Sequence, residues 1–440
     1  MLYARLLGAS TRAGEDDFCV YALVYLKRRW TGPSRRRIAR VTSFGRLPAR
    51  GRRLLTSTVH RPAIALALVI AACTSASAPT SSGHENVTVT DKTASELVAV
   101  LGAGQTAMGK KDLAGFQATI DLSRAAFRRC QTETFDIAAQ QGFTPFDVKI
   151  AKVERYLDTY VRAYVGNDAK GYSRTYFRKE GGLWIRTEPL DSELGGDQTK
   201  TFDGLQLSYY GIDSDVIDKY AAAGKDARAF LIKLAEGRTT MGPGFGLRIF
   251  PTRGAAGPNV SCSEAGTSLT NSTNGPFVRL YSNALLFTPD LTAVTDATAA
   301  VIRHDGLHWL QDHFIIGITA RLPFWLREGW PDFVGGSRTF AAKKGVLCFA
   351  STPTPTFKQL EDGALETSQT PPNLAVQYYA FANTMVEYVY KIGGGANAYW
   401  DLMRAYQGGV DARVNLTKTL GVTPEAFYSG WLVWARQTYC

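Results

Sequence analysis

The chain has 440 residues and a formal net charge of +11, which favours at least two domains and raises the question of a nucleic-acid or membrane-surface partner. The charge is confined to the N-terminus, because residues 1–72 hold 14 of the 50 Lys and Arg residues but 3 of the 39 acidic ones. The remainder has 36 residues of each kind and is neutral. The composition therefore argues against a nucleic-acid partner.

The N-terminal region has the order of charged and apolar residues that is typical of a targeting signal. Arg52, Arg53 and Arg61 precede an uncharged apolar run of about ten residues (63–72), which is too short to span a bilayer but suits a signal peptide. The run ends at Cys73, and Ile-Ala-Ala-Cys resembles a bacterial lipobox, whose cysteine is lipidated. An ordinary secretory signal that contains a cysteine is the alternative. Either signal implies export, as an outward-facing lipoprotein of the cell membrane or as a secreted protein.

The expected organisation has six parts. They are a start-site extension or disordered leader (1–55), a signal peptide with a lipobox (56–73), a flexible tether rich in Ser, Thr, Pro and Ala (74–90), a small α+β domain (91–190), a linker (191–201) and a larger C-terminal domain (202–440).

Four cysteines remain outside the leader and the signal, namely Cys130, Cys262, Cys348 and Cys440. An even number in an exported protein suggests two disulfides, and the sequence leaves all three possible pairings open. Four buried thiols are the alternative.

Residues 91–190 combine short helices with a meander of strands. Apolar residues recur at helical spacing over 94–101 and 113–116, and strand-like stretches follow at 146–150, 160–165, 173–178 and 183–186. A Lys-Glu-Gly-Gly sequence between the last two stretches indicates a hairpin. This order resembles an NTF2-like domain, a cone-shaped fold with a curved sheet. Packing, rather than ligand binding, is its expected role.

The C-terminal domain begins with mixed elements and ends with helices, so the whole chain is expected to be α+β. The predicted elements are a strand at 205–210, a helix at 214–236, strands at 247–250 and 278–281, and late helices at 378–391, 396–406 and 424–434.

The most informative motif is His304-Asp-Gly-Leu-His308, which is followed twenty residues later by Glu328. Two histidines four residues apart on a helix project from the same face, so their imidazoles can converge on one ion. Glu328 lies in a Trp-Leu-Arg-Glu-Gly-Trp-Pro-Asp sequence that predicts a second helix. Three protein ligands would leave the fourth position of a catalytic zinc for water. His313, five residues after His308, points off the ligand face.

Residues 299–336 resemble the HExxH-x19-E signature of the gluzincin zinc metallopeptidases, and especially the bacterial peptidase MA-like group, with its RHELTH and LPxWLxEGLAEYV sequences. The resemblance implies a zincin-like, two-lobed domain with a mainly helical C-terminal lobe. It also implies one Zn²⁺ per chain, held by His304, His308 and Glu328, and a peptide or protein substrate. Asp332 matches the carboxylate that in these families hydrogen-bonds the far nitrogen of a ligating histidine, with His304 as its partner.

Two further positions match catalytic residues or helices of the family. Tyr379 begins a sequence similar to the AYxxSxxxVxYL helix of the family and can donate to an oxyanion; a tyrosine that only packs in the core is the alternative. Asp305 stands where the family has its catalytic Glu. Aspartate has the same proton-transfer chemistry, but its carboxylate ends about 1.5 Å short, a displacement that can cost on the order of a hundredfold in rate.

The sequence thus favours zinc-dependent hydrolysis of peptide bonds at the cell envelope, slowed by the aspartate. Two alternatives stay open. The first is a non-catalytic binding module of the cell envelope that holds a peptide or a partner protein in a metallopeptidase-like cleft. The second is a structural lipoprotein without a metal. The predicted contact with the membrane is through the N-terminal lipid anchor only.

Overall fold

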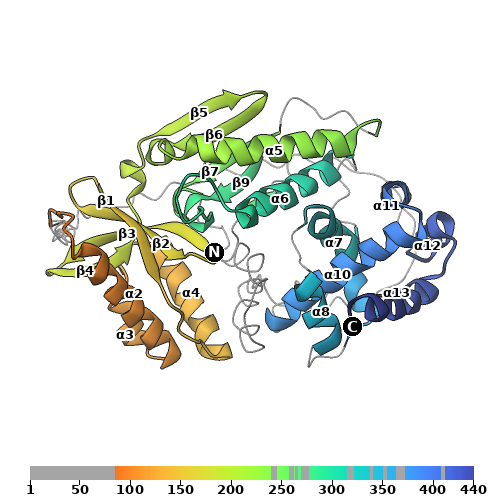
Figure 1. Cartoon of the computed structure of the whole chain (residues 1–440), viewed down its shortest axis with the longest axis horizontal. Helices are drawn as coiled ribbons and strands as arrows, with labels where there is room; N and C mark the ends of the chain where they lie inside the picture. The colour runs from red at the N-terminus through yellow and green to blue at the C-terminus, as the bar shows by residue number, and fades with distance from the viewer. Residues whose placement is uncertain are drawn as a thin grey trace, which may run out of the picture. The chain divides into compact units, whose positions relative to one another are not determined.

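The computed structural model describes residues 85–238, 245–256, 262, 266–268, 277–314, 322–336, 340–349, 354–362, 372–407 and 412–440. The predicted leader, signal peptide and Cys73, and most of the predicted tether, lie outside these residues. Within them the chain is mixed α+β, with two sheets and a helical C-terminal region, as expected for the class (Figure 1). None of the described helices is both long and apolar enough to cross a membrane.

The first sheet is an antiparallel meander that follows three helices. The helices are α2 (Thr93–Gly109), α3 (Leu113–Gln117) and α4 (Ala125–Gln141). The strands are β1 (Lys149–Tyr156), β2 (Tyr160–Asn167), β3 (Gly171–Glu180) and β4 (Leu183–Thr187), in the spatial order β1-β2-β3-β4. The strands predicted at 160–165, 173–178 and 183–186 are confirmed, whereas the first strand begins only at Lys149. Helix α4 was not predicted.

Local sequence explains the ends of several of these elements. The carboxylate of Asp112 accepts a hydrogen bond from the Gly115 N–H at 2.9 Å and caps α3. Gly181 and Gly182 both have positive φ, which a two-residue hairpin of the primed type requires, and they join β3 to β4 as predicted. Val87, at the end of the predicted tether, is buried in the core beneath this sheet.

The second sheet has five strands in the order β5-β6-β7-β9-β8. The strands are β5 (Asp197–Phe202), β6 (Leu205–Tyr210), β7 (Gly246–Phe250), β8 (Gly266–Ser268) and β9 (Phe277–Tyr281). Strands β6, β7 and β9 are parallel, and α5 (Ile217–Ala235) makes the crossover from β6 to β7.

The segment 191–201, predicted to be a linker, contributes structure instead. A short 3₁₀ helix, η2 (Asp191–Glu193), is followed by Gly195 and Gly196 with positive φ, and then by strand β5, which pairs with β6. Its Asp-Gln-Thr-Lys-Thr sequence is exposed on both faces, because β5 is an edge strand. The alternation of apolar and polar residues that marks a half-buried strand is therefore absent from it.

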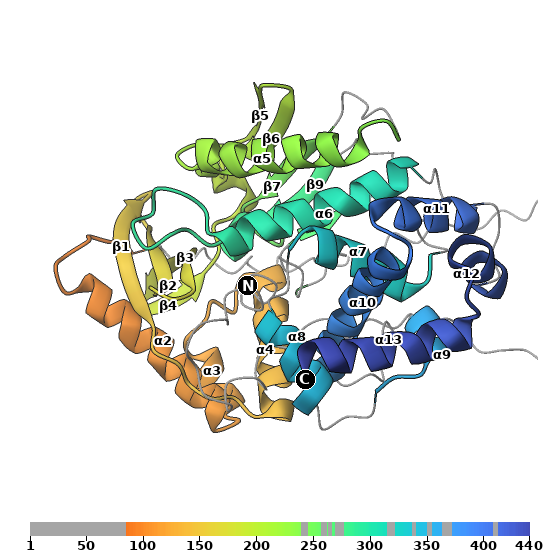
Figure 2. The same cartoon turned by 45° about the vertical axis from the view of Figure 1, so that its right-hand side comes forward.

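The remaining elements are helices, which Figure 2 shows from a second direction. They are α6 (Asp296–Phe314), α7 (Phe324–Val334), α8 (Phe340–Phe349), α9 (Phe357–Asp362), α10 (Pro372–Ile392), α11 (Ala396–Gln407), α12 (Ala412–Leu420) and α13 (Pro424–Tyr439); η3 (Gly211–Asp213) and η5 (Ser282–Ala284) are short 3₁₀ turns.

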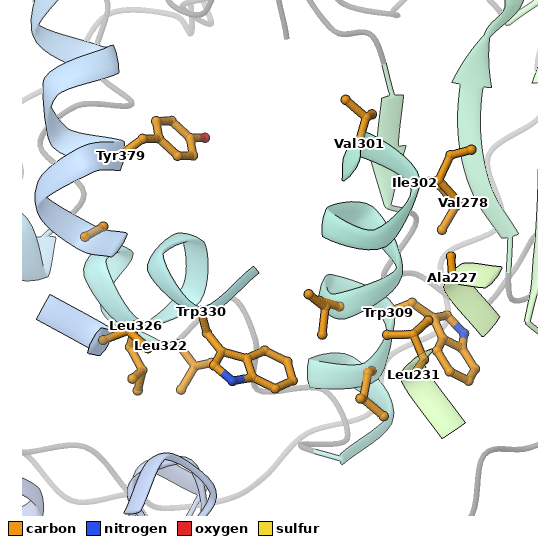
Figure 3. Packing of buried hydrophobic residues seen from close by; sticks show 14 of the residues in the cluster. Ala227, Leu231, Val278, Val301, Ile302, Trp309, Leu322, Leu326, Trp330 and Tyr379 are labelled. Atoms are coloured by element: carbon orange, nitrogen blue, oxygen red, sulfur yellow. The ribbon is translucent and has the colours of Figure 1, made fainter. Parts of the chain in front are cut away.

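The largest core surrounds helix α6. Figure 3 shows Ile302 and Trp309 of α6 beside Val278 of β9 and Leu231 of α5, while Trp330 of α7 lies on the other side of α6. Helix α6 is therefore buried between the second sheet with α5 and the later helices. Side chains on its face toward α7 are removed from bulk water.

Two glycines permit the close helix contacts at this core. A Cβ atom at Gly306 would lie 2.7 Å from Cδ1 of Leu231, so the glycine brings α6 against α5. A Cβ atom at Gly329 would lie 2.3 Å from the carbonyl oxygen of Ala382, so the second glycine brings α7 against α10. These contacts fix the helices that carry the predicted metal ligands.

Charged pairs join the first sheet to the residues that follow the second sheet's β6. Arg174 of β3 forms an ion pair with Asp213, and both side chains are fully buried. Arg162 of β2 contacts Asp215 at 2.7 Å. Because each buried charge has a partner here, the pairs avoid the penalty of an isolated charge.

Two disulfides are present, and they resolve the pairing that the sequence left open. Cys130 of α4 is bonded to Cys262, and Cys348 of α8 is bonded to Cys440 at the C-terminus. The second bond closes a loop of 92 residues around the helical region.

Removing the second disulfide tests its contribution to the stability of the helical region. We expect Cys348→Ser/Cys440→Ser to lower the free energy of unfolding by about 2–5 kcal/mol, because the cross-link reduces the entropy of the unfolded chain. Chemical denaturation of the oxidised wild type and the double variant measures the change. An unchanged denaturation midpoint would contradict a stabilising disulfide between these two cysteines.

Candidate metal centre

Three side chains from two helices converge on one buried point. His304 and His308 project from α6, and their Nε2 atoms are 3.1 Å apart. Oε2 of Glu328, on α7, lies 3.1 Å from Nε2 of His308 and 3.8 Å from Nε2 of His304. All three residues are at most 9% exposed. The group has the composition and spacing needed to hold a metal ion.

The far nitrogen of each histidine faces a hydrogen-bond acceptor. Nδ1 of His304 lies 3.1 Å from Oδ1 of Asp332, so the predicted contact is present. Nδ1 of His308 lies 3.0 Å from Oε1 of Gln311. Each Nδ1 therefore carries a ring proton, and each Nε2, once it is deprotonated, presents a lone pair to the common point.

The orientation of Gln311 is fixed by its own partners. Its Nε2 donates to the Tyr399 hydroxyl at 2.9 Å and to the carbonyl of Arg327 at 3.1 Å. Pro331, four residues after Arg327 in helix α7, has no N–H, so this carbonyl lacks its helical donor. Gln311 supplies the missing donor, and its oxygen is thereby turned toward His308.

Sequence reasoning missed Gln311, although a signal for it was present. The proline inside the Glu-Gly-Trp-Pro-Asp sequence predicts an unsatisfied carbonyl four residues earlier. A glutamine three residues after His308 lies near the same helical face and can bridge the two.

The electrostatics of the site favour a bound cation. Burial alone would raise the pKa of Glu328, but His308, His304 and Arg327 hold it well below its usual range. Burial alone would lower the pKa of His304, but hydrogen bonds to Asp332 and Glu328 raise it to about 10. The carboxylates thus stabilise positive charge at this point, and an ion must displace a proton to bind.

Asp305 lies beside this group with an unused oxygen. Its side chain is buried, and Oδ2 has no hydrogen-bond partner among the described residues. Burial raises the pKa of Asp305 to about 6. A buried carboxylate oxygen without a donor is costly, which is typical of a site that awaits a ligand or a water molecule.

The remaining predicted site residues are Tyr379, His313 and Cys73, and the structure describes the side chain of Tyr379 only. Tyr379 of α10 is buried, and its ring packs edge-on against Phe324 at the start of α7, at 5.3 Å between centroids. Figure 3 shows its hydroxyl pointing from α10 toward α6. Its role in catalysis stays a prediction. His313 lies within α6, but its side chain lies outside the described residues, as does Cys73.

Comparisons with known proteins give no family for this chain. No model of a known protein family matches the sequence, and a search of curated proteins finds no match. The functional argument therefore depends on the geometry of the site.

Replacing Gln311 tests whether it positions His308. We expect Gln311→Leu to weaken Zn²⁺ binding by about 10- to 100-fold, because His308 loses the acceptor that fixes its tautomer and ring orientation. Competition with a chromophoric chelator measures the affinity, and Gln198→Leu on the exposed strand β5 is the matched control. Equal affinities in the two variants would contradict the role.

Proposed function

We propose that this chain is an exported zinc metallopeptidase of the gluzincin type, related to the peptidase MA-like group, with an NTF2-like domain before the catalytic one. The observation that carries the proposal is the convergence of His304, His308 and Glu328 beside the unpaired carboxylate oxygen of Asp305. The order β6-α5-β7-β9-α6 supports a zincin-like domain, and the four-stranded meander after three helices supports an NTF2-like one.

The ligand set suits zinc better than Ca²⁺ or Mg²⁺. Bonds of about 2.0–2.1 Å in tetrahedral geometry place ligand atoms about 3.3 Å apart. The three separations here are 3.1, 3.1 and 3.8 Å. Two imidazole nitrogens exclude the all-oxygen shells that Ca²⁺ and Mg²⁺ prefer. Three protein ligands also leave one position open, as in catalytic rather than structural zinc sites.

A zinc ion held by His304, His308 and Glu328 would supply Lewis-acid polarisation of the scissile carbonyl and of the attacking water. Asp305 Oδ2, which is buried without a hydrogen-bond partner among the described residues, would accept a proton from that water as the new carbon–oxygen bond forms. The same carboxyl group then returns the proton to the leaving amine as the carbon–nitrogen bond breaks. The proton count is balanced, and Asp305 is regenerated.

The neighbouring residues hold this arrangement in place. Asp332 and Gln311 orient the two imidazoles, and Nε of Arg327 lies 3.0 Å from Oε1 of Glu328, which leaves Oε2 for the ion. Tyr379 is the candidate donor to the developing oxyanion. Export is supported by the two disulfides, which form and persist in oxidising compartments. In the proposal Cys73 carries the lipid anchor.

Substitutions of Asp305 test the catalytic part of the proposal. We expect the wild type to cleave members of a peptide library, and Asp305→Asn to lose at least about 100-fold in rate, because the amide cannot accept the proton. Zinc content should stay unchanged in this variant, since Asp305 is not a ligand. Asp305→Glu should retain or increase the activity, because the longer carboxylate reaches further toward the water.

One outcome separates the enzyme from the non-catalytic alternative. If the wild type is inactive on the whole library while Asp305→Glu acquires activity, the natural chain keeps its metal but lacks a competent base. The cleft would then serve as a binding module for a peptide or partner protein, and the peptidase proposal would be wrong.

A further inference from the structure

A cavity that shares no lining residue with the candidate metal centre lies against the first sheet. Its volume is about 290 Å³, near the lower end of the range for sites that bind small molecules. Helices α2 and α4, the segment after α4, and strands β2 to β4 contribute to its wall. The apolar part of the wall includes Leu101, Met108, Phe127, Ile137, Phe143 and Val165.

Arg186 of β4 brings a positive charge into this apolar cavity. Its guanidinium carbon lies 5.4 Å from the centroid of the Phe116 ring, and Nη2 lies beside Gly104 of α2, 3.8 Å from where a Cβ atom would be. The buried Nε has no hydrogen-bond partner, and no ion pair joins the side chain to any residue that the structure describes.

The other charged groups that line the cavity are compensated. Arg174 is paired with Asp213 and Asp215. Glu188 accepts a hydrogen bond from Asn283 at 3.3 Å; burial raises the pKa of Glu188 to about 7, and Arg253 offsets part of that shift. Arg186 is thus the uncompensated charge among the described lining residues.

Burial lowers the pKa of Arg186 to about 10, and no nearby charge offsets this effect. The side chain nevertheless remains a cation at neutral pH. A partly buried cation without an anion, beside an apolar wall, costs free energy, so its retention suggests that an anion is bound there in use.

We propose that this cavity binds a small monocarboxylate with an apolar body, and that Arg186 is its anchor. The planar guanidinium presents paired donors that match the two oxygens of a carboxylate. The apolar wall from α2 and α4 fits the body of the ligand, and one uncompensated charge suits a monoanion better than a phosphate dianion. The site shares no residue with the metal centre, so this inference does not depend on the proposed peptidase activity.

Calorimetric titration of the purified full chain with octanoate tests the proposal. We expect octanoate to bind and octanamide, which has a similar shape but no charge, to bind at least about tenfold more weakly. Arg186→Met should weaken octanoate binding by about 10- to 100-fold and bring it to the level of octanamide. Arg186→Lys should bind octanoate with an affinity between those of the wild type and Arg186→Met. The lysine keeps the positive charge but lacks the paired donors of the guanidinium.

Arg155→Gln is the matched control, since this arginine lies on β1 of the same sheet with its side chain 54% exposed. It should leave octanoate binding unchanged. Three results would each overturn the proposal: no binding of octanoate, equal affinities for octanoate and octanamide, or an equal loss of octanoate affinity in Arg186→Met and Arg155→Gln.

Thermal unfolding without ligand gives an independent readout that a structural arginine would not share. Arg186→Met should raise the melting temperature, because it removes a partly buried charge that has no ion-pair partner among the described residues. Octanoate should raise the melting temperature of the wild type but not of this variant. A lower melting temperature for Arg186→Met would show that the arginine serves the fold and would contradict the binding role.

Discussion

The metal centre depends on one electrostatic constraint. The hydrogen bonds from Asp332 and Gln311 place the ring protons of both histidines on Nδ1, so the two Nε2 lone pairs and the Glu328 carboxylate face the same buried point. Three electron-rich atoms 3.1–3.8 Å apart repel one another unless a proton or a metal cation lies between them. The rest of the arrangement, from the tautomers to the position of Glu328, is consistent with this single requirement.

The scaffold meets that requirement through local features of α6 and α7. Gly329 lets α7 approach α10, and Pro331 frees the Arg327 carbonyl that orients Gln311. A change in either residue would therefore reach the metal ligands without touching them. The glycine and the proline are poor helix formers on propensity alone, and the contacts that they permit explain why they occur within this helix.

Part of this account could be predicted from the sequence. The spacing of His304 and His308 determines that they share a helical face, because helical periodicity is a local property, whereas Glu328 was predicted from the resemblance to the gluzincin signature. Strand β5 was missed because its sequence is largely polar and carries little periodic signal. The disulfide pairing and the cavity around Arg186 depend on contacts between distant segments, which spacing along the chain does not specify.

The central claim is that one zinc ion is bound by two histidines and one glutamate. Its most direct test is the metal content of the purified full chain by mass spectrometry, beside His304→Ala and Glu328→Ala, with His313→Ala and the exposed Glu236→Ala as matched controls. The account predicts one zinc per chain in the wild type and both controls, and none in the two ligand variants. A wild type that binds no zinc after reconstitution, or ligand variants that keep it, would contradict the account.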